Sequence, residues 1–275
     1  MKLAIGTGGL EPEFNKNYWK VFLDAIENGN YIHSALNYPN VSQYFKKASL
    51  ENIKISKTII KIEINRNPIK KIFNIPKQID RILEKFNLEK VDTLQVCNNP
   101  GANKINMFFI KNIFNRYKKK GIINNLYLEC FDPFSENLNK LINDNFFHGY
   151  IFKFNCLQRS SSKLFFDNII NSQKKIISIS PLAGGNFIKI MNNFDIDLKN
   201  SLDEIIRKNN IEDYNSLNIA FLKSKKNIEH CIFGTKNITR LFRIKSDIEN
   251  IQPLKDEDFN KILDLQDKYK TVINF

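Results

Sequence analysis

The sequence predicts a single α/β domain, residues 1–275, folded as a (β/α)8 TIM barrel. Three observations favour this fold: a length of 275 residues, short β-branched runs that alternate with longer helical patterns, and eight such strand-then-helix units in succession. An open doubly wound sheet is the alternative, and it normally carries a G-x-G-x-x-G turn after its first strand. Here Gly6-Thr7-Gly8-Gly9 follows a very short run and no helix begins directly after it. We therefore interpret this segment as a glycine-rich turn that closes the first strand.

The elements follow from local patterning, with β-branched and aromatic runs predicting strands and 3.6-residue periodicity predicting helices. The expected strands are Leu3–Ile5, Tyr31–Ser34, Ile53–Ile59, Thr93–Cys97, Ile123–Leu128, Gly149–Phe154, Ile176–Ser180 and Glu229–Phe233. The expected helices between them are Asn17–Asn28, Val41–Lys47, Pro76–Phe86, Lys104–Lys120, Ser135–Asn143, Ser161–Asn171, Ser201–Lys208, Tyr214–Lys223 and Thr239–Asn250. A last helix, Asp256–Lys268, follows Pro253 and is expected to cover either the base or the mouth of the barrel.

Composition excludes several classes of protein. The net charge is +13, from 42 Lys and Arg against 29 Asp and Glu, but the basic residues are spread along the chain and no helix-turn-helix or RNA-binding pattern occurs. We therefore expect no specific nucleic-acid partner, although a phosphorylated ligand would suit the charge. No apolar run is long enough for a membrane-spanning helix, and the N-terminal segment lacks the apolar core of a secretory signal. The expectation is a cytoplasmic protein with no membrane partner.

The four cysteines are Cys97, Cys130, Cys156 and Cys231. Their wide spacing, without a C-x-x-C pair, favours reduced thiols over a disulfide framework or a zinc site. Cys156 and Cys231 are expected to be ordinary buried residues, and no metal is expected. His148 and His230 are expected at the surface or at a strand edge.

In a barrel of this type the functional residues lie on the loops that follow the strands. Polar or glycine-rich segments occur at five of the expected strand ends: His33–Tyr38, Ser56–Thr58, Gln95–Pro100, Ser180–Gly185 and Gly234–Asn237. These segments are where we expect the site.

With these segments the sequence resembles the aldo-keto reductase family, over nearly the whole length from Leu3 to Leu241. The most specific matches are Ile179-Ser180-Pro181-Leu182-Ala183-Gly184-Gly185, the Gly234-Thr235-Lys236 turn and Asn155-Cys156-Leu157-Gln158-Arg159. The resemblance implies a (β/α)8 barrel and NADP(H)-dependent reduction of a small carbonyl or sugar-derived substrate. In that family a tyrosine gives a proton to the carbonyl oxygen, a lysine beside it lowers the phenol pKa, an aspartate holds the lysine and a histidine orients the substrate.

Carried over by position, the catalytic set is Tyr38 as proton donor, Lys57 as the lysine, His33 in place of the aspartate and Cys97 in place of the histidine. An imidazole cannot supply the negative charge that pairs with a lysine, and a thiol is a weak hydrogen-bond partner. Two of the four positions are therefore altered.

The nicotinamide pocket implied by the resemblance is altered as well. Glu129-Cys130 aligns with the Ser-Asn pair, Ile151 with the glutamine and Ile179 with the tyrosine that stacks on the ring. The Glu129 carboxylate either joins the site or points into solvent. Hydride transfer requires the ring to be held closely, so these changes weaken the expectation of redox activity.

The phosphate side keeps more of the family pattern. The expected cofactor-binding residues are Ser180, Leu182, Gly184, Gly234, Thr235, Lys236 and Arg240. Backbone N–H groups at a helix start can hold a phosphate, and Arg240 aligns with the residue that reads the adenosine 2′-phosphate. The match is partial, because Ile244 stands where an asparagine is expected.

Three functions remain open from the sequence. The first is an NADP(H)-dependent oxidoreductase with Tyr38 as the proton donor. The second is a catalytically impaired member of the family that binds a nucleotide or acts in regulation, as the joint replacement of residues 33, 97, 129, 130, 151 and 179 suggests. The third is a barrel enzyme of altered chemistry, such as a lyase, that uses Tyr38, Lys57 and Glu129.

Overall fold

The computed structural model describes residues 1–11, 13–64, 74–98, 104–130, 145–157, 167–169, 172–182 and 196–269. Eight parallel strands close into a barrel in the order β1 to β8, so β1 pairs with both β2 and β8. The strands are β1 (Lys2–Gly6), β2 (Tyr31–Ala35), β3 (Thr58–Ile64), β4 (Val91–Asn98), β5 (Ile123–Cys130), β6 (Gly149–Lys153), β7 (Lys175–Ile179) and β8 (Ile228–Phe233). The predicted (β/α)8 barrel is confirmed.

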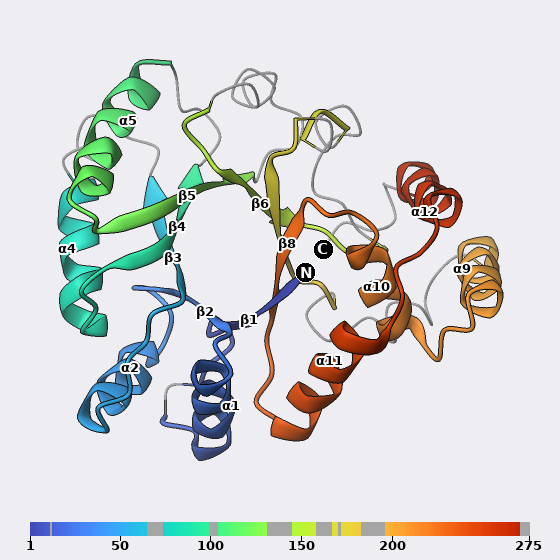
Figure 1. Ribbon diagram of the computed structural model, residues 1–275, viewed down its shortest axis with the longest axis horizontal. Helices are drawn as coiled ribbons and strands as arrows, with labels where there is room; N and C mark the ends of the chain where they lie inside the picture. Colours follow the sequence, from blue (N-terminus) through green and yellow to red (C-terminus); the bar gives the residue numbers. More distant parts are fainter. Residues whose placement is uncertain are drawn as a thin grey trace.

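Helices surround the ring of strands (Figure 1). They are α1 (Lys16–Glu27), α2 (Val41–Leu50), α4 (Asn74–Phe86), α5 (Lys104–Lys119), α9 (Ile196–Lys208), α10 (Tyr214–Lys223), α11 (Ile238–Asn250) and α12 (Asp256–Lys268). The helix expected at Ser135–Asn143 lies outside the described residues, and of Ser161–Asn171 only the helical residues 167–169 are described. Apolar residues at helical spacing bury one face of a helix, as Ile75, Ile79, Ile82 and Phe86 do in α4.

Two apolar clusters follow from the alternation of side chains along each strand. Outward-facing residues such as Ile60 and Ile62 join the large core between sheet and helices. Inward-facing residues such as Ile59 and Tyr127 form a smaller cluster inside the barrel. Lys61 and Glu129 lie two positions further along β3 and β5, so they also face inward, closer to the carboxyl end. Polar side chains of these two strands therefore lie at the mouth of the barrel.

The third strand differs from its expected position. The sequence predicts Ile53–Ile59, whereas β3 runs from Thr58 to Ile64 and its pairing with β2 begins at Ile32 and Thr58. The alternating isoleucines at 53 and 55 resemble a strand locally, but they belong to the loop after α2 and pack against the outer core. A strand begins where a neighbouring strand can pair with it, and that depends on β2 rather than on residues 53–57 themselves.

The last helix, α12, packs beside α10. The rings of Phe221 and Phe259 are stacked with centroids 4.7 Å apart, and Gln266 donates a hydrogen bond of 2.7 Å to the backbone oxygen of Asn155. Because Asn155 follows β6, the helix after Pro253 lies towards the mouth side of the barrel.

His230 is not at the surface, which corrects the expectation from the sequence. It lies on β8 with only 3% of its surface exposed, and its ring is 4.3 Å from that of Tyr31. Its Nδ1 atom is buried without a hydrogen-bond partner. His148 is exposed as expected, and its Nδ1 accepts a hydrogen bond from the Leu126 backbone.

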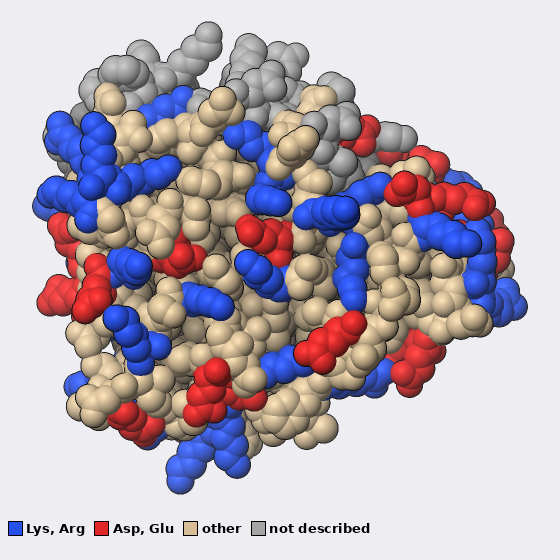
Figure 2. Space-filling model, in the orientation of Figure 1, with Lys and Arg blue, Asp and Glu red and all other residues tan. Residues whose placement is uncertain are grey.

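On the face shown in Figure 2, the positive charges are spread out rather than gathered into one patch. Figure 2 shows Lys and Arg over many elements of the visible face, with Asp and Glu between them. Within the described ranges, no helix is both long and apolar enough to cross a membrane. Three cysteines are buried free thiols: Cys97, Cys156 and Cys231. The structure does not describe the side chain of Cys130.

Candidate active site

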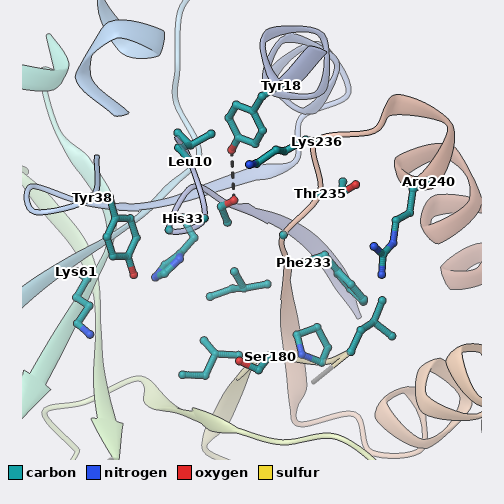
Figure 3. Close-up of a pocket in the computed structure, with 18 of the residues that line it drawn as sticks. Leu10, Tyr18, His33, Tyr38, Lys61, Ser180, Phe233, Thr235, Lys236 and Arg240 are labelled. Atoms are coloured by element: carbon teal, nitrogen blue, oxygen red, sulfur yellow. Dashed lines mark hydrogen bonds between the residues drawn. The ribbon is translucent and has the colours of Figure 1, made fainter. Parts of the chain in front are cut away.

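A cavity of about 830 Å³ opens at the carboxyl ends of the strands. It is lined by the loops after β1, β2, β7 and β8 and by inward-facing side chains of β3, β4 and β5. Figure 3 shows the hydroxyl of Tyr38 and the amine of Lys61 pointing into it from one side, and Arg240 pointing in from the other. The cavity therefore has a polar end near β2 to β5 and a cationic end near α11.

Tyr38 is held in the tight turn after β2, where its backbone N–H bonds the oxygen of Ala35 at 3.2 Å. Burial raises the pKa of the phenol above its ordinary value of 10, partly opposed by the positive charge of Lys61. The phenol is therefore protonated at neutral pH and can act as a proton donor.

Lys61 projects inward from β3 and forms an ion pair with Glu129 of β5. The Lys61 Nζ and Glu129 Oε2 atoms are 3.3 Å apart, and the side chains are only 14% and 3% exposed. Burial lowers the pKa of Lys61, but the nearby Glu129 carboxylate outweighs it, so the net direction is upward and the amine stays charged. Burial raises the pKa of Glu129, with Lys61 and Gln95 acting in the opposite direction.

Gln95 of β4 connects this pair to His33 of β2. The amide nitrogen of Gln95 donates to Glu129 Oε2 at 2.7 Å, and the amide oxygen lies 2.8 Å from His33 Nε2. Because the amide nitrogen is used by the carboxylate, its oxygen must accept, and His33 must carry its proton on Nε2. Burial lowers the pKa of His33 to about 4, so the imidazole is neutral near pH 7.

The cationic end is formed by the turn between β8 and α11. The hydroxyl of Thr235 accepts from the Asn237 backbone at 3.2 Å, and the Asn237 side chain caps α11 by accepting from the Arg240 backbone at 3.2 Å. Lys236 forms an ion pair of 2.5 Å with Glu11 from the loop after β1. Among the described residues Arg240 has no ion-pair partner. Two cations and a helix start thus face the same end of the cavity.

Comparison with known proteins gives matches only at the level of structure. No protein-family model and no curated protein sequence matches the chain. A solved structure of a thermostable aldo-keto reductase in complex with the inhibitor epalrestat matches with a TM-score of 0.70 and 18% identity, over 96% of this chain and 94% of that one. An aldo-keto reductase from a Medee basin deep-sea metagenome library matches with a TM-score of 0.71 and 14% identity, over 96% and 90%. The fold is that of the aldo-keto reductases.

The expectation that Lys57 stands beside Tyr38 is wrong. Lys57 precedes β3, is exposed, and donates a hydrogen bond of 2.7 Å to the Gly29 backbone at the amino-terminal end of the barrel. Lys61 is the lysine that shares the cavity with Tyr38. The error follows directly from the misplaced third strand, which put position 57 at a strand end instead of position 61.

Of the other expected catalytic residues, His33 lines the cavity and Cys97 does not. Cys97 faces inward on β4 near Glu129, and burial raises the pKa of its thiol to about 12. A thiol held in its neutral form is a poor nucleophile and a poor proton carrier. Cys97 therefore packs next to Glu129 inside the barrel but does not line the cavity.

Most of the expected cofactor-binding residues come together. The cavity is lined by Ser180, Leu182, Gly234, Thr235, Lys236 and Arg240. Gly184 lies outside the described residues.

From the sequence, Lys61 was not expected in the site, Gln95 was named only as the start of a segment at a strand end, and the direction of Glu129 stayed open. Lys61 interrupts an isoleucine run at the positions that face the barrel interior, as Ile59, Lys61 and Glu63 alternate with Ile60, Ile62 and Ile64. A lysine on the inward face of an otherwise apolar strand is costly unless it is paired or functional, and that signal was available in the sequence.

Proposed function

We propose that the protein is an NADP(H)-dependent oxidoreductase that reduces a small carbonyl compound or sugar derivative, with Tyr38 as the proton donor. The observation that carries this proposal is a single cavity that holds the Tyr38 phenol and the Lys61 ammonium at one end and Thr235, Lys236 and Arg240 at the other. A dinucleotide with a phosphorylated adenosine end and a reactive nicotinamide end suits such a division.

The donors at the cationic end fit the phosphates of NADP(H). Lys236 and Arg240 provide two cations, and the first turn of α11 provides backbone N–H groups. Apart from Gly234 and its two chain neighbours, no atom of the described residues lies within 4 Å of where a Cβ on Gly234 would stand, so a phosphate oxygen can approach the backbone there. Phosphate binding at Lys236 requires its ion pair with Glu11 to open or to rearrange.

In the proposed reaction the Tyr38 hydroxyl gives its proton to the carbonyl oxygen of the substrate. Lys61 stays charged and stabilises the phenolate that remains on Tyr38. The bound nicotinamide supplies the hydride. His33, neutral and fixed through Gln95, presents an uncharged polar surface beside the substrate.

The nicotinamide end favours a second candidate, a protein that binds the dinucleotide without redox turnover. Ile179 lines the cavity where the resemblance implies a stacking tyrosine, and Ile151 is buried in the barrel interior where it implies a glutamine. The Asn155 amide is already used, donating to the Ser180 backbone and accepting from Leu157, each at 3.0 Å. These residues offer the nicotinamide ring few polar contacts.

Nicotinamide fluorescence and carbonyl turnover test the proposal together. We expect NADPH to bind more tightly than NADH, and Tyr38→Phe to lower kcat for aldehyde reduction by about 10²- to 10⁴-fold with little change in NADPH affinity. Tyr18→Phe is the matched control, because the Tyr18 hydroxyl in the same cavity bonds the Gly6 backbone at 3.3 Å. Binding without turnover over a carbonyl panel would favour the second candidate, and absence of dinucleotide binding would refute both.

A further inference from the structure

The acidic partner of Lys61 comes from an unexpected strand. The resemblance implies an aspartate on β2, and that position is His33. The structure instead brings a carboxylate from β5, with Glu129 Oε2 at 3.3 Å from Lys61 Nζ. Glu129 is buried, so its direction, open from the sequence alone, is into the site.

We propose that Glu129 is the positioning residue that holds Lys61 charged and aimed at Tyr38, in place of a carboxylate on β2. The proposal rests on the proposed function for its catalytic consequence, but the Glu129–Lys61 pairing itself can be measured without any turnover.

The strand register makes this replacement possible. Lys61 of β3 pairs in register with Gln95 of β4, and Cys97, two residues further along β4, pairs with Glu129 of β5. Side chains at alternate positions face the same way, so Lys61 and Glu129 both enter the barrel near its mouth. The Gln95 amide lies between β3 and β5 and donates to the same Glu129 oxygen that faces Lys61. Gln95 thus fixes the carboxylate in the orientation that serves the lysine.

The ion pair with Glu129 is needed to keep Lys61 charged because Lys61 is largely buried. A buried ammonium group loses hydration, and without a nearby anion its pKa falls and it becomes neutral. Glu129 is the largest influence that keeps the pKa of Lys61 high. The same carboxylate raises the pKa of the Tyr38 phenol. Removing its charge therefore lowers both pKa values.

The neutral His33 fits this arrangement of charge. With the charge supplied from β5, the β2 position does not need an acid, and Gln95 links the imidazole to the carboxylate as a neutral donor. A charge-relocation variant follows from this. In Glu129→Gln combined with His33→Asp, the carboxylate moves to the place that the resemblance implies, and the pKa of Lys61 should return towards its native value.

The test measures the pKa of Lys61 directly, by NMR of ¹³C-labelled lysine side chains with the Lys61→Met spectrum as the assignment reference. We expect Glu129→Gln to lower this pKa by about one unit or more. We also expect kcat for carbonyl reduction to fall by about tenfold or more, with its alkaline limb moved to lower pH and NADPH affinity unchanged. The variant His33→Asp/Glu129→Gln should recover most of the Lys61 pKa and part of kcat.

Glu63→Gln is the matched control. Glu63 lies on β3 two residues beyond Lys61, and it is exposed and bonded to Asn37. Its loss should move the pKa of Lys61 far less than the loss of Glu129. Thermal melting shows whether Glu129→Gln folds. Glu129→Asp, which keeps the negative charge, is measured in the same way and should retain a raised pKa of Lys61.

The outcomes separate the two proposals. An unchanged Lys61 pKa in folded Glu129→Gln would overturn the role of Glu129, whatever the activity. A lowered Lys61 pKa in Glu129→Gln, together with a wild-type protein that binds no dinucleotide and reduces no carbonyl, would support the pairing and refute the proposed function. A lowered Lys61 pKa with full kcat would show that the pairing exists but does not position the lysine for catalysis, and would overturn the proposal.

Discussion

At the scale of single residues, two lysines four positions apart occupy opposite ends of the barrel. Lys57 donates to the Gly29 backbone at the amino-terminal end, and Lys61 lies in the cavity with Tyr38. At roughly 3.3 Å per residue their backbones are about 13 Å apart along β3. Of these two lysines, only Lys61 is close enough to influence the phenol of Tyr38.

The two lysines can therefore be compared as variants. We expect Lys61→Met to lower kcat for carbonyl reduction by about 10²-fold or more, because it removes the charge that stabilises the phenolate. Lys57→Met should leave kcat near the wild-type value, since it loses only an exposed hydrogen bond to a backbone oxygen. Steady-state kinetics measures both, and thermal melting shows whether Lys61→Met folds, because it leaves the buried Glu129 without that partner. Equal losses in the two variants would contradict this assignment.

At the scale of elements, the close approach of β6 to its neighbours depends on one small residue. A Cβ on Gly149 would stand 2.1 Å from the backbone oxygen of Lys175 on β7 and 2.6 Å from the Tyr127 ring of β5. The β7 backbone is fixed by strand pairing, and the Tyr127 ring is buried and held by the hydrogen bond that its hydroxyl donates to Glu229. The barrel therefore closes at β6 only with glycine at this position.

We expect Gly149→Ala to lower the free energy of unfolding by roughly 3 kcal/mol, since the added methyl group must push the paired strands apart. Chemical denaturation followed by circular dichroism measures the loss. Gly9→Ala is the control, because beyond its chain neighbours no atom in the described part of the chain lies within 4 Å of its added Cβ, and its stability should stay close to that of the wild type. A stable Gly149→Ala variant would mean that β6 and β7 do not approach as closely as described.

At the scale of the whole molecule, two buried histidines make stability depend on pH. Burial lowers the pKa of both His33 and His230 from 6.5 to about 4. In the unfolded chain both take up a proton as the pH falls below about 6.5, whereas in the folded protein both stay neutral until about pH 4. The unfolded state therefore binds more protons in this window, and stability falls as the pH decreases through it.

We expect each histidine to account for a loss on the order of 3 kcal/mol between about pH 6.5 and pH 4. The free energy of unfolding, measured by denaturant titration at several pH values, should fall less steeply in His230→Phe, which keeps a ring against Tyr31 and removes the unpaired Nδ1. His33→Gln should reduce the slope in the same way. If neither substitution changes the slope over this window, the two histidines are not buried in their neutral forms.

The sequence by itself determined the fold class and the position of Tyr38 and the α11 turn. Alternating strand and helix patterns are local, and the glycine-rich segments near residues 180 and 234 are short motifs that keep their meaning without tertiary contacts. The tertiary structure decided which lysine meets Tyr38 and where its carboxylate comes from. The start of β3 depends on pairing with β2, and the contact of Lys61 with Glu129 joins residues 68 positions apart across an intervening strand. Such contacts are set by strand register and barrel closure, which are cooperative properties of all eight strands, so no local pattern in the chain identifies which carboxylate pairs with Lys61.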